Sequence, residues 1–90
     1  MNIENLKKQL AEEGYKKIYI WEDLPDSVYE PHSHRISTKI IILDGEMSLR
    51  LDGKVGKLKK GDMAEIAARQ LHSAVIGQEG CRYLVGEGKK

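Results

Sequence analysis

The sequence predicts an all-β fold, a single small antiparallel β-barrel or jelly roll preceded by one short N-terminal helix. From Tyr15 onward, short apolar runs are separated by turn residues at even spacing, which is typical of antiparallel sandwiches and barrels. Asp44-Gly45 and Asp52-Gly53 stand between apolar runs and indicate hairpins, because both central positions of a type I′ turn need φ > 0. No helical pattern separates the strands, which argues against a parallel sheet.

The helix is predicted over residues 3–13, where apolar side chains recur at helical spacing, at Ile3, Leu6, Leu10 and Ala11. Asn2 can cap its start and Gly14 can end it. So short a helix is marginal on its own in water, so we expect it to pack against an apolar surface.

The strands follow as alternating or apolar segments. Residues 15–21 alternate with period two and form a lead-in strand, whereas Pro25-Asp26 and Pro31 mark the next stretch as a loop. Further strands are predicted at residues 38–43, 46–51, 55–58, 63–66, 71–76 and 81–86, with turns at 44–45, 52–53, 60–62 and 77–80.

Composition limits the class of protein and its partners. Ninety residues suffice for one domain, and a hydrophobic content of 40% favours a globular chain. The net charge of +1, with both signs mixed along the chain, does not suggest nucleic acid. No apolar run approaches the ~18 residues of a membrane helix, no signal-peptide pattern begins the sequence, and Cys81 has no disulfide partner. We therefore expect a cytoplasmic protein that binds neither nucleic acid nor membrane.

The three histidines, His32, His34 and His72, are the candidate site. In an extended segment, side chains at i and i+2 lie on one face about 6–7 Å apart, so His32 and His34 can face one interior point. Three imidazoles with open positions form a recognised catalytic metal arrangement. The alternative from spacing alone is that His32 and His34 are exposed loop residues and His72 is a hydrogen-bonded core histidine.

At these residues the stretch 31–76 resembles the double motif of the cupin superfamily. The family's first motif has the form H-x-H, three or four residues, E, six residues, G. Here His32-Ser33-His34 is followed by Thr38 and Gly45.

The second cupin motif opens with glycine, runs through a Pro-x-Gly turn and reaches a histidine. Here Gly61 opens it, Ala67 and Arg69 stand at the proline and glycine positions, and His72 falls at the expected place. The resemblance implies one cupin domain over residues 1–90, with the helix and lead-in strand at 1–24 and the barrel at 25–87.

The resemblance also implies that His32, His34 and His72 bind a divalent transition metal (Zn, Fe, Ni or Mn). Thr38 occupies the position of the usual metal-binding glutamate, or Lys39 does if the longer spacing is counted. Neither is a good metal ligand, so the resemblance implies three ligands and no fourth. With an ion bound, the nearest ring nitrogens should lie within about 3–4 Å of each other, and a separation beyond about 8 Å would contradict the site.

Strand alternation predicts the surroundings of the histidines. If the chain continues extended from His34, the side chains on its face are those of Ile36, Thr38, Ile40 and Ile42. This pattern predicts an apolar pocket with a few polar groups, which is typical of a site for a small-molecule ligand or substrate.

Ile41 and Leu43 make the opposite face of the same strand apolar too. Something must cover that face, and small cores gain stability from association. We therefore expect a homodimer, with the helix and the strand at residues 15–21 crossing or covering the interface.

The fold does not fix the function. One hypothesis is a metal-dependent enzyme that acts on a small molecule at the ion's free positions. The alternatives are a non-catalytic module that binds or senses a small molecule without a metal, and a metal-free structural or regulatory partner protein. The sequence identifies no acid or base beside the histidines, so the choice stays open.

Overall fold

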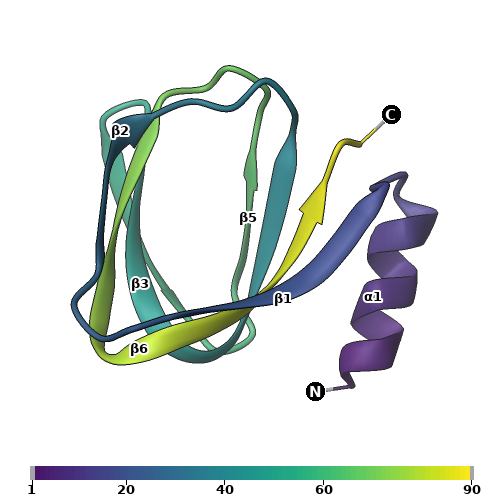
Figure 1. Ribbon diagram of the computed structural model, residues 1–90, viewed down its shortest axis with the longest axis horizontal. Coiled ribbons are helices and arrows are strands. Elements are labelled where there is room, and N and C mark those ends of the chain that lie inside the picture. The colour runs from purple at the N-terminus through teal and green to yellow at the C-terminus, as the bar shows by residue number, and fades with distance from the viewer. Residues whose placement is uncertain (1, 90) are drawn as a thin grey trace.

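An antiparallel sheet of six strands, with one short helix, makes up the computed structural model, which describes residues 2–89 (Figure 1). The elements in chain order are α1 (Ile3–Glu12), β1 (Lys17–Asp23), β2 (Val28–His32), β3 (Thr38–Leu51), β4 (Lys54–Lys59), β5 (Met63–Ile66) and β6 (His72–Glu87). The prediction of an antiparallel β fold with a short N-terminal helix is confirmed. The first and last residues of the predicted domain, 1 and 90, lie outside the described residues.

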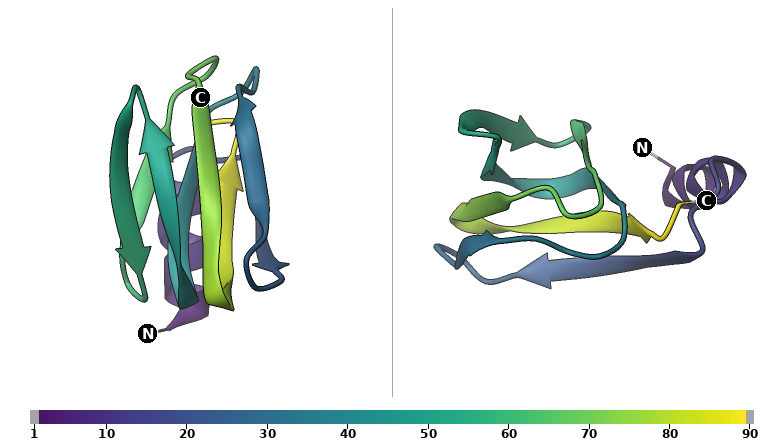
Figure 2. Two further views of the ribbon diagram at one scale, coloured as in Figure 1. Left: turned by 90° about the vertical axis from the view of Figure 1, so that its left-hand side faces the viewer. Right: turned by 90° about the horizontal axis from the view of Figure 1, so that it is seen from above.

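The two longest strands, β3 and β6, form the centre of the sheet. The hydrogen-bonded order is β1-β6-β3-β4, with β2 paired to the first part of β6 and β5 to the first part of β3. Figures 1 and 2 show the sheet curling over so that β2 and β5 come to face each other across it. Among residues 2–89 the strand pairing does not close into a ring, so the closed barrel of the sequence-based prediction is here an open, curled sheet.

The predicted turn at Asp44-Gly45 is wrong, because β3 runs through it as one strand. The β3–β6 register shifts on both sides of this dipeptide, and Gly45 has a φ of 76°. Gly80 likewise has a φ of 78° inside β6, where a turn was expected at residues 77–80. A β-bulge uses a left-handed glycine just as a hairpin turn does, so the local sequence does not separate the two.

The other Asp-Gly dipeptide does form the predicted hairpin. Asp52 and Gly53 have φ values of 50° and 80°, and Leu51 pairs with Lys54 across the turn. These angles match the positive φ that a type I′ turn needs at both central positions.

The predicted loop around Pro31 is wrong in part, because it contains the strand β2. Tyr29 pairs with Ala74 of β6, and Pro31 lies on a strand with one sheet neighbour. Proline is tolerated on such an edge strand, where its missing N–H does not interrupt a ladder.

Helix α1 covers the outer face of β3. Leu10 packs with Ile41, Leu43 and Leu84 in a buried cluster that is separate from the inner core. The helix lies outside the curled sheet, away from β2 (Figure 1). The face that suggested a dimer is therefore covered within the chain. Among the described residues, no helix has the length and apolar character needed to cross a membrane.

Candidate metal centre

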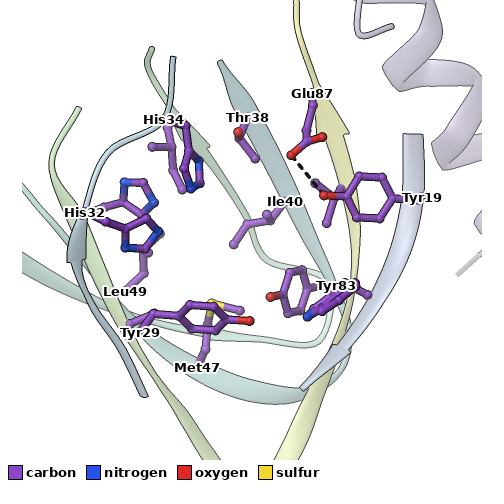
Figure 3. A pocket seen from close by; sticks show the side chains of 15 residues that line it. Tyr19, Tyr29, His32, His34, Thr38, Ile40, Met47, Leu49, Tyr83 and Glu87 are labelled. Atoms are coloured by element: carbon purple, nitrogen blue, oxygen red, sulfur yellow. Dashed lines mark hydrogen bonds between the residues drawn. The ribbon is translucent and has the colours of Figure 1, made fainter. Parts of the chain in front are cut away.

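The concave side of the curled sheet holds a cavity of about 280 Å³ (Figure 3). Its walls combine aliphatic and aromatic side chains, and its polar side chains include the three histidines and three tyrosines. The inner core lies against the same walls, formed in part by Ile40, Met47, Leu49 and Ile66. This is the apolar pocket with a few polar groups that strand alternation predicts.

The structure brings the three predicted histidines together at one side of this cavity. His32 ends β2, His72 begins β6, and the two are cross-strand partners. His34 lies two residues beyond the end of β2. One ring nitrogen from each histidine lies within 4.8 Å of those from the other two. This spacing is slightly wider than the 3–4 Å expected around a bound ion and well inside the 8 Å limit.

Backbone carbonyls orient two of the three rings. The Nδ1 atom of His32 is 2.6 Å from the carbonyl oxygen of Glu30, and Nδ1 of His72 is 2.9 Å from that of Gln70. A carbonyl oxygen only accepts hydrogen bonds, so each Nδ1 carries the proton and donates. The lone pair of Nε2 is then free, which is the arrangement that metal-binding histidines use.

The protonation of His34 also suits a ligand. Burial lowers its pKa, and the neighbouring His72 and His32 lower it further. A lowered pKa keeps the ring neutral to lower pH, and the neutral imidazole is the form that binds a metal. His72 is the most enclosed of the three, with 6% of its surface exposed.

Thr38 and Lys39, the two candidates for the glutamate position, point to opposite sides of β3. Thr38 lines the cavity and is 5% exposed. Within residues 2–89, its Oγ1 atom has no hydrogen-bond partner. Lys39 instead forms an ion pair with Glu13, the residue that follows α1, at 2.8 Å between Nζ and Oε1. The position inside the pocket therefore belongs to Thr38.

The prediction that Ile36 shares the face of His34 is wrong. The chain bends at residues 35–36, between β2 and β3, and Ile36 is 45% exposed. Alternation holds only while the backbone stays extended, so it resumes at Thr38 and Ile40, which do line the pocket.

Two carboxylates that bind the tyrosine hydroxyls of the pocket, Glu87 and Asp23, were not predicted from the sequence. The Tyr19 hydroxyl donates a hydrogen bond of 3.1 Å to Glu87 Oε2. Asp23 accepts hydrogen bonds from the hydroxyls of Tyr29 and Tyr83, at 2.6 and 2.7 Å. The alternation of β1 placed Tyr19 on one face, but only its pairing with β6 shows that this face lines the pocket.

The family model described as Cupin domain matches residues 19–87 of this chain. The match therefore runs from β1 to the end of β6 and includes all three histidines. No curated protein matches the chain.

Several solved structures share the fold at low sequence identity. The cupin domain of Schizosaccharomyces pombe Cnp3 superposes with a TM-score of 0.74 at 13% identity, covering 81% of this chain and 52% of that one. An RmlC-like cupin from Shewanella frigidimarina gives 0.70 at 20% identity, covering 81% and 66%. KdgF from a Halomonas species gives 0.68 at 16% identity, covering 89% of both chains. The chain thus spans about half to two thirds of the first two structures and most of the third.

Proposed function

The chain belongs to the cupin domain family, and from this premise we propose that it is a single-domain cupin that binds a divalent transition metal through His32, His34 and His72. The domain extends over residues 1–90, and the region predicted as its barrel, 25–87, forms most of the open, curled sheet. The ion's remaining positions take a small-molecule ligand or substrate. The observation that carries this proposal is the approach of the three ring nitrogens to within 4.8 Å of one another.

The donor set fits such an ion. Imidazole nitrogen suits Zn, Fe and Ni, and it also occurs as a ligand of Mn among harder oxygen donors. The backbone bonds to Nδ1 of His32 and His72 support coordination through Nε2. Three neutral donors leave coordination positions open, and a metal held in this way supplies Lewis-acid chemistry or an activated water.

The second candidate is a non-catalytic module that binds or senses a small molecule without a metal. Thr38 favours it, because a neutral hydroxyl stands where the first cupin motif carries a metal-binding carboxylate. The apolar side chains and the tyrosine hydroxyls that line the cavity suit a small amphipathic ligand with or without a metal.

Metal analysis of the protein, purified without chelator or affinity tag, separates the two candidates. We expect about one divalent ion per chain in the wild type and loss of the ion in His72→Ala, because two imidazoles that are close in sequence form a weak site. Circular dichroism of both proteins checks that the variant is folded. A wild type that takes up no ion from buffered zinc, nickel, iron or manganese would favour the metal-free module.

A further inference from the structure

We propose that Thr38 and Glu87 form a subsite for a hydroxyl group, so that the pocket selects a small hydroxylated anion over the same anion without the hydroxyl. This inference rests on the proposed metal site, because the ion supplies the position that an anionic group occupies. Figure 3 shows Thr38 lying between His34 and Glu87 at the pocket wall.

Thr38 is the first observation. Its side chain lines the cavity, it is 95% buried, and its hydroxyl oxygen has no hydrogen-bond partner in the described part of the chain. Buried polar groups nearly always have a partner, and each exception needs an explanation. A hydroxyl left free on the wall of a cavity is available to a group bound in that cavity.

Glu87 is the second observation. It is the cross-strand partner of Thr38, in the register that pairs the start of β3 with the end of β6. Directly opposed residues in an antiparallel pair have neighbouring side chains on the same face. Both residues line the cavity, and Glu87 is the only carboxylate among the described residues that do so.

Tyr19 orients the Glu87 carboxylate through one hydrogen bond and leaves its other acceptor sites available. Its hydroxyl donates to Oε2, and burial together with this hydrogen bond raises the pKa of Tyr19 to about 12, so the phenol stays a donor at neutral pH. A carboxylate has about four acceptor sites on its two oxygens. Glu87 therefore keeps acceptor capacity for a second donor.

A hydroxyl group complements this pair better than other common groups. It can donate to Glu87 and at the same time accept from the Thr38 hydroxyl. An ammonium group only donates, so the hydroxyl proton of Thr38 would have no acceptor on it. A carboxylate group at this position would be repelled by the charge of Glu87. Hydroxyl binding therefore satisfies both side chains at once.

Charge and size define the rest of the ligand. Three neutral imidazoles leave a divalent ion its full charge, and the single carboxylate of Glu87 offsets only part of it. The remaining excess matches one anionic group at an open position of the ion. A cavity of about 280 Å³ lies just below the usual range of about 300–1,000 Å³ for ligand pockets, which favours a small molecule.

Matched pairs of carboxylates test the subsite: acetate against glycolate, propionate against 3-hydroxypropionate, and butyrate against 4-hydroxybutyrate. Each is titrated into the cobalt-loaded protein and followed by the visible absorption of the ion, after titration with cobalt alone. We expect at least one hydroxylated member to bind about tenfold or more tightly than its partner, the range expected for a hydrogen bond to a charged group.

Three variants assign that preference to residues. Thr38→Val removes the hydroxyl at nearly constant shape and should reduce the preference about threefold or more, whereas Thr38→Ser should retain it. Glu87→Gln removes the charge of the acceptor and should reduce the preference at least as much. Glu65→Gln is the matched control, because Glu65 lies outside the cavity lining with its side chain largely exposed, and it should change nothing.

The outcomes separate this inference from the proposed function. Failure of the wild type to bind cobalt overturns both. Cobalt binding with no preference in any pair, or with a preference that Thr38→Val or Glu87→Gln leaves unchanged, overturns the hydroxyl subsite and leaves the metal site standing. A preference unchanged in Thr38→Val would mean that an ordinary water molecule satisfies Thr38.

Discussion

In this pocket, the position that carries glutamate in the first cupin motif holds Thr38, whose neutral hydroxyl is buried beside the histidines. Lys39, the alternative at that position, lies on the other side of β3 and pairs with Glu13. The protein side of the proposed metal site is therefore three neutral imidazoles, which leave the charge of the ion to be balanced by water, by a ligand or at longer range by Glu87.

Thr38→Glu should raise metal affinity by about tenfold or more, because it adds an anionic oxygen close to the ion. It should also weaken the binding of an external anion such as azide, which would compete for the same position. Affinity is measured by competition with a chromogenic chelator. Thr38→Gln is the control, being equal in size to glutamate and neutral, and equal affinities for the two variants would contradict the placement of Thr38 beside the ion.

Thr38→Val should not destabilise the protein free of metal and ligand. The wild-type hydroxyl is buried with no partner among residues 2–89, so its removal saves desolvation and should leave the free energy of unfolding unchanged or raise it by about 1 kcal/mol. Urea denaturation measures the difference. A loss of more than about 1 kcal/mol would mean that the hydroxyl has a partner within the fold.

Strands β3 and β6 pair with each other over most of their length and, between them, with all the other strands of the sheet. Their register shifts next to Gly45. A side chain at Gly45 would collide with the carbonyl group of Gly80, and both residues have a positive φ. The core around the pocket and the cluster under α1 lie on opposite faces of these two strands.

Gly45→Ala should cost at least about 2 kcal/mol of unfolding free energy, because it adds left-handed strain and a backbone clash. Gly53→Ala is the matched control: its φ is 80°, but a side chain there meets nothing within 4 Å, so only the strain remains, about 1 kcal/mol. Urea denaturation of both variants gives the comparison. Equal losses would contradict the close approach of Gly45 to Gly80.

The ion pair between Glu13 and Lys39 should make the docking of α1 depend on pH. The hydrogen bond from Lys39 lowers the pKa of Glu13, so the stability it contributes is present above the ordinary carboxyl pKa and is lost as the pH falls through the lowered value. The same bond raises the pKa of Lys39, so its contribution is lost only as the pH rises through that raised value.

Glu13→Gln should therefore cost about 1–2 kcal/mol at pH 7, and the difference from wild type should shrink as the pH falls below about 4. Chemical denaturation between pH 3 and pH 7 measures this. Glu12→Gln, a neighbouring carboxylate on α1, is the control. A difference that stays constant down to pH 3 would show that the ion pair contributes nothing to the docking of α1.

For helices, strands and turns, the sequence predicts the features that short-range patterns determine. It does not predict those that depend on pairing between strands far apart in the chain. The hairpin at Asp52-Gly53, the helix cap at Asn2 and the strand Met63–Ile66 follow from short-range patterns, and the structure has all three. Asp44-Gly45 carries the same local signal as the hairpin but lies in a bulge, because β6 continues alongside β3 past that point. No local pattern reports the position of a strand more than thirty residues away.

At the scale of the molecule, one curled sheet has two apolar sides, an inner one around the pocket and an outer one under α1. The cupin spacing of His32, His34 and His72 was enough to predict that they lie together. The carboxylate of Glu87 was not predictable in this way, because its place in the pocket depends on the pairing of the two chain-distant strands β3 and β6. Motifs thus identify the histidine side of the site, and topology supplies the opposite side.

The homodimer stays a prediction, but the apolar face that suggested it is covered by α1 of the same chain. Ile41 and Leu43, which suggested it, are buried under α1 of the same chain, although apolar side chains such as Leu24 and Leu71 remain exposed. Sedimentation equilibrium at micromolar concentration measures the mass. A value near 20 kDa is expected for the dimer, and a value near the chain mass of 10.2 kDa would contradict it.

Nitrogen-15 NMR of the histidine side chains, before and after addition of one equivalent of zinc, tests whether His32, His34 and His72 bind one ion together. Without zinc, we expect His32 and His72 to carry their protons on Nδ1, as the carbonyl oxygens of Glu30 and Gln70 require. With one equivalent, the Nε2 signals of His32 and His72 and the signal of one ring nitrogen of His34 should all shift together and then stop changing. Shifts at fewer than three histidines, or shifts that continue well beyond one equivalent, would contradict a metal site built from these three residues.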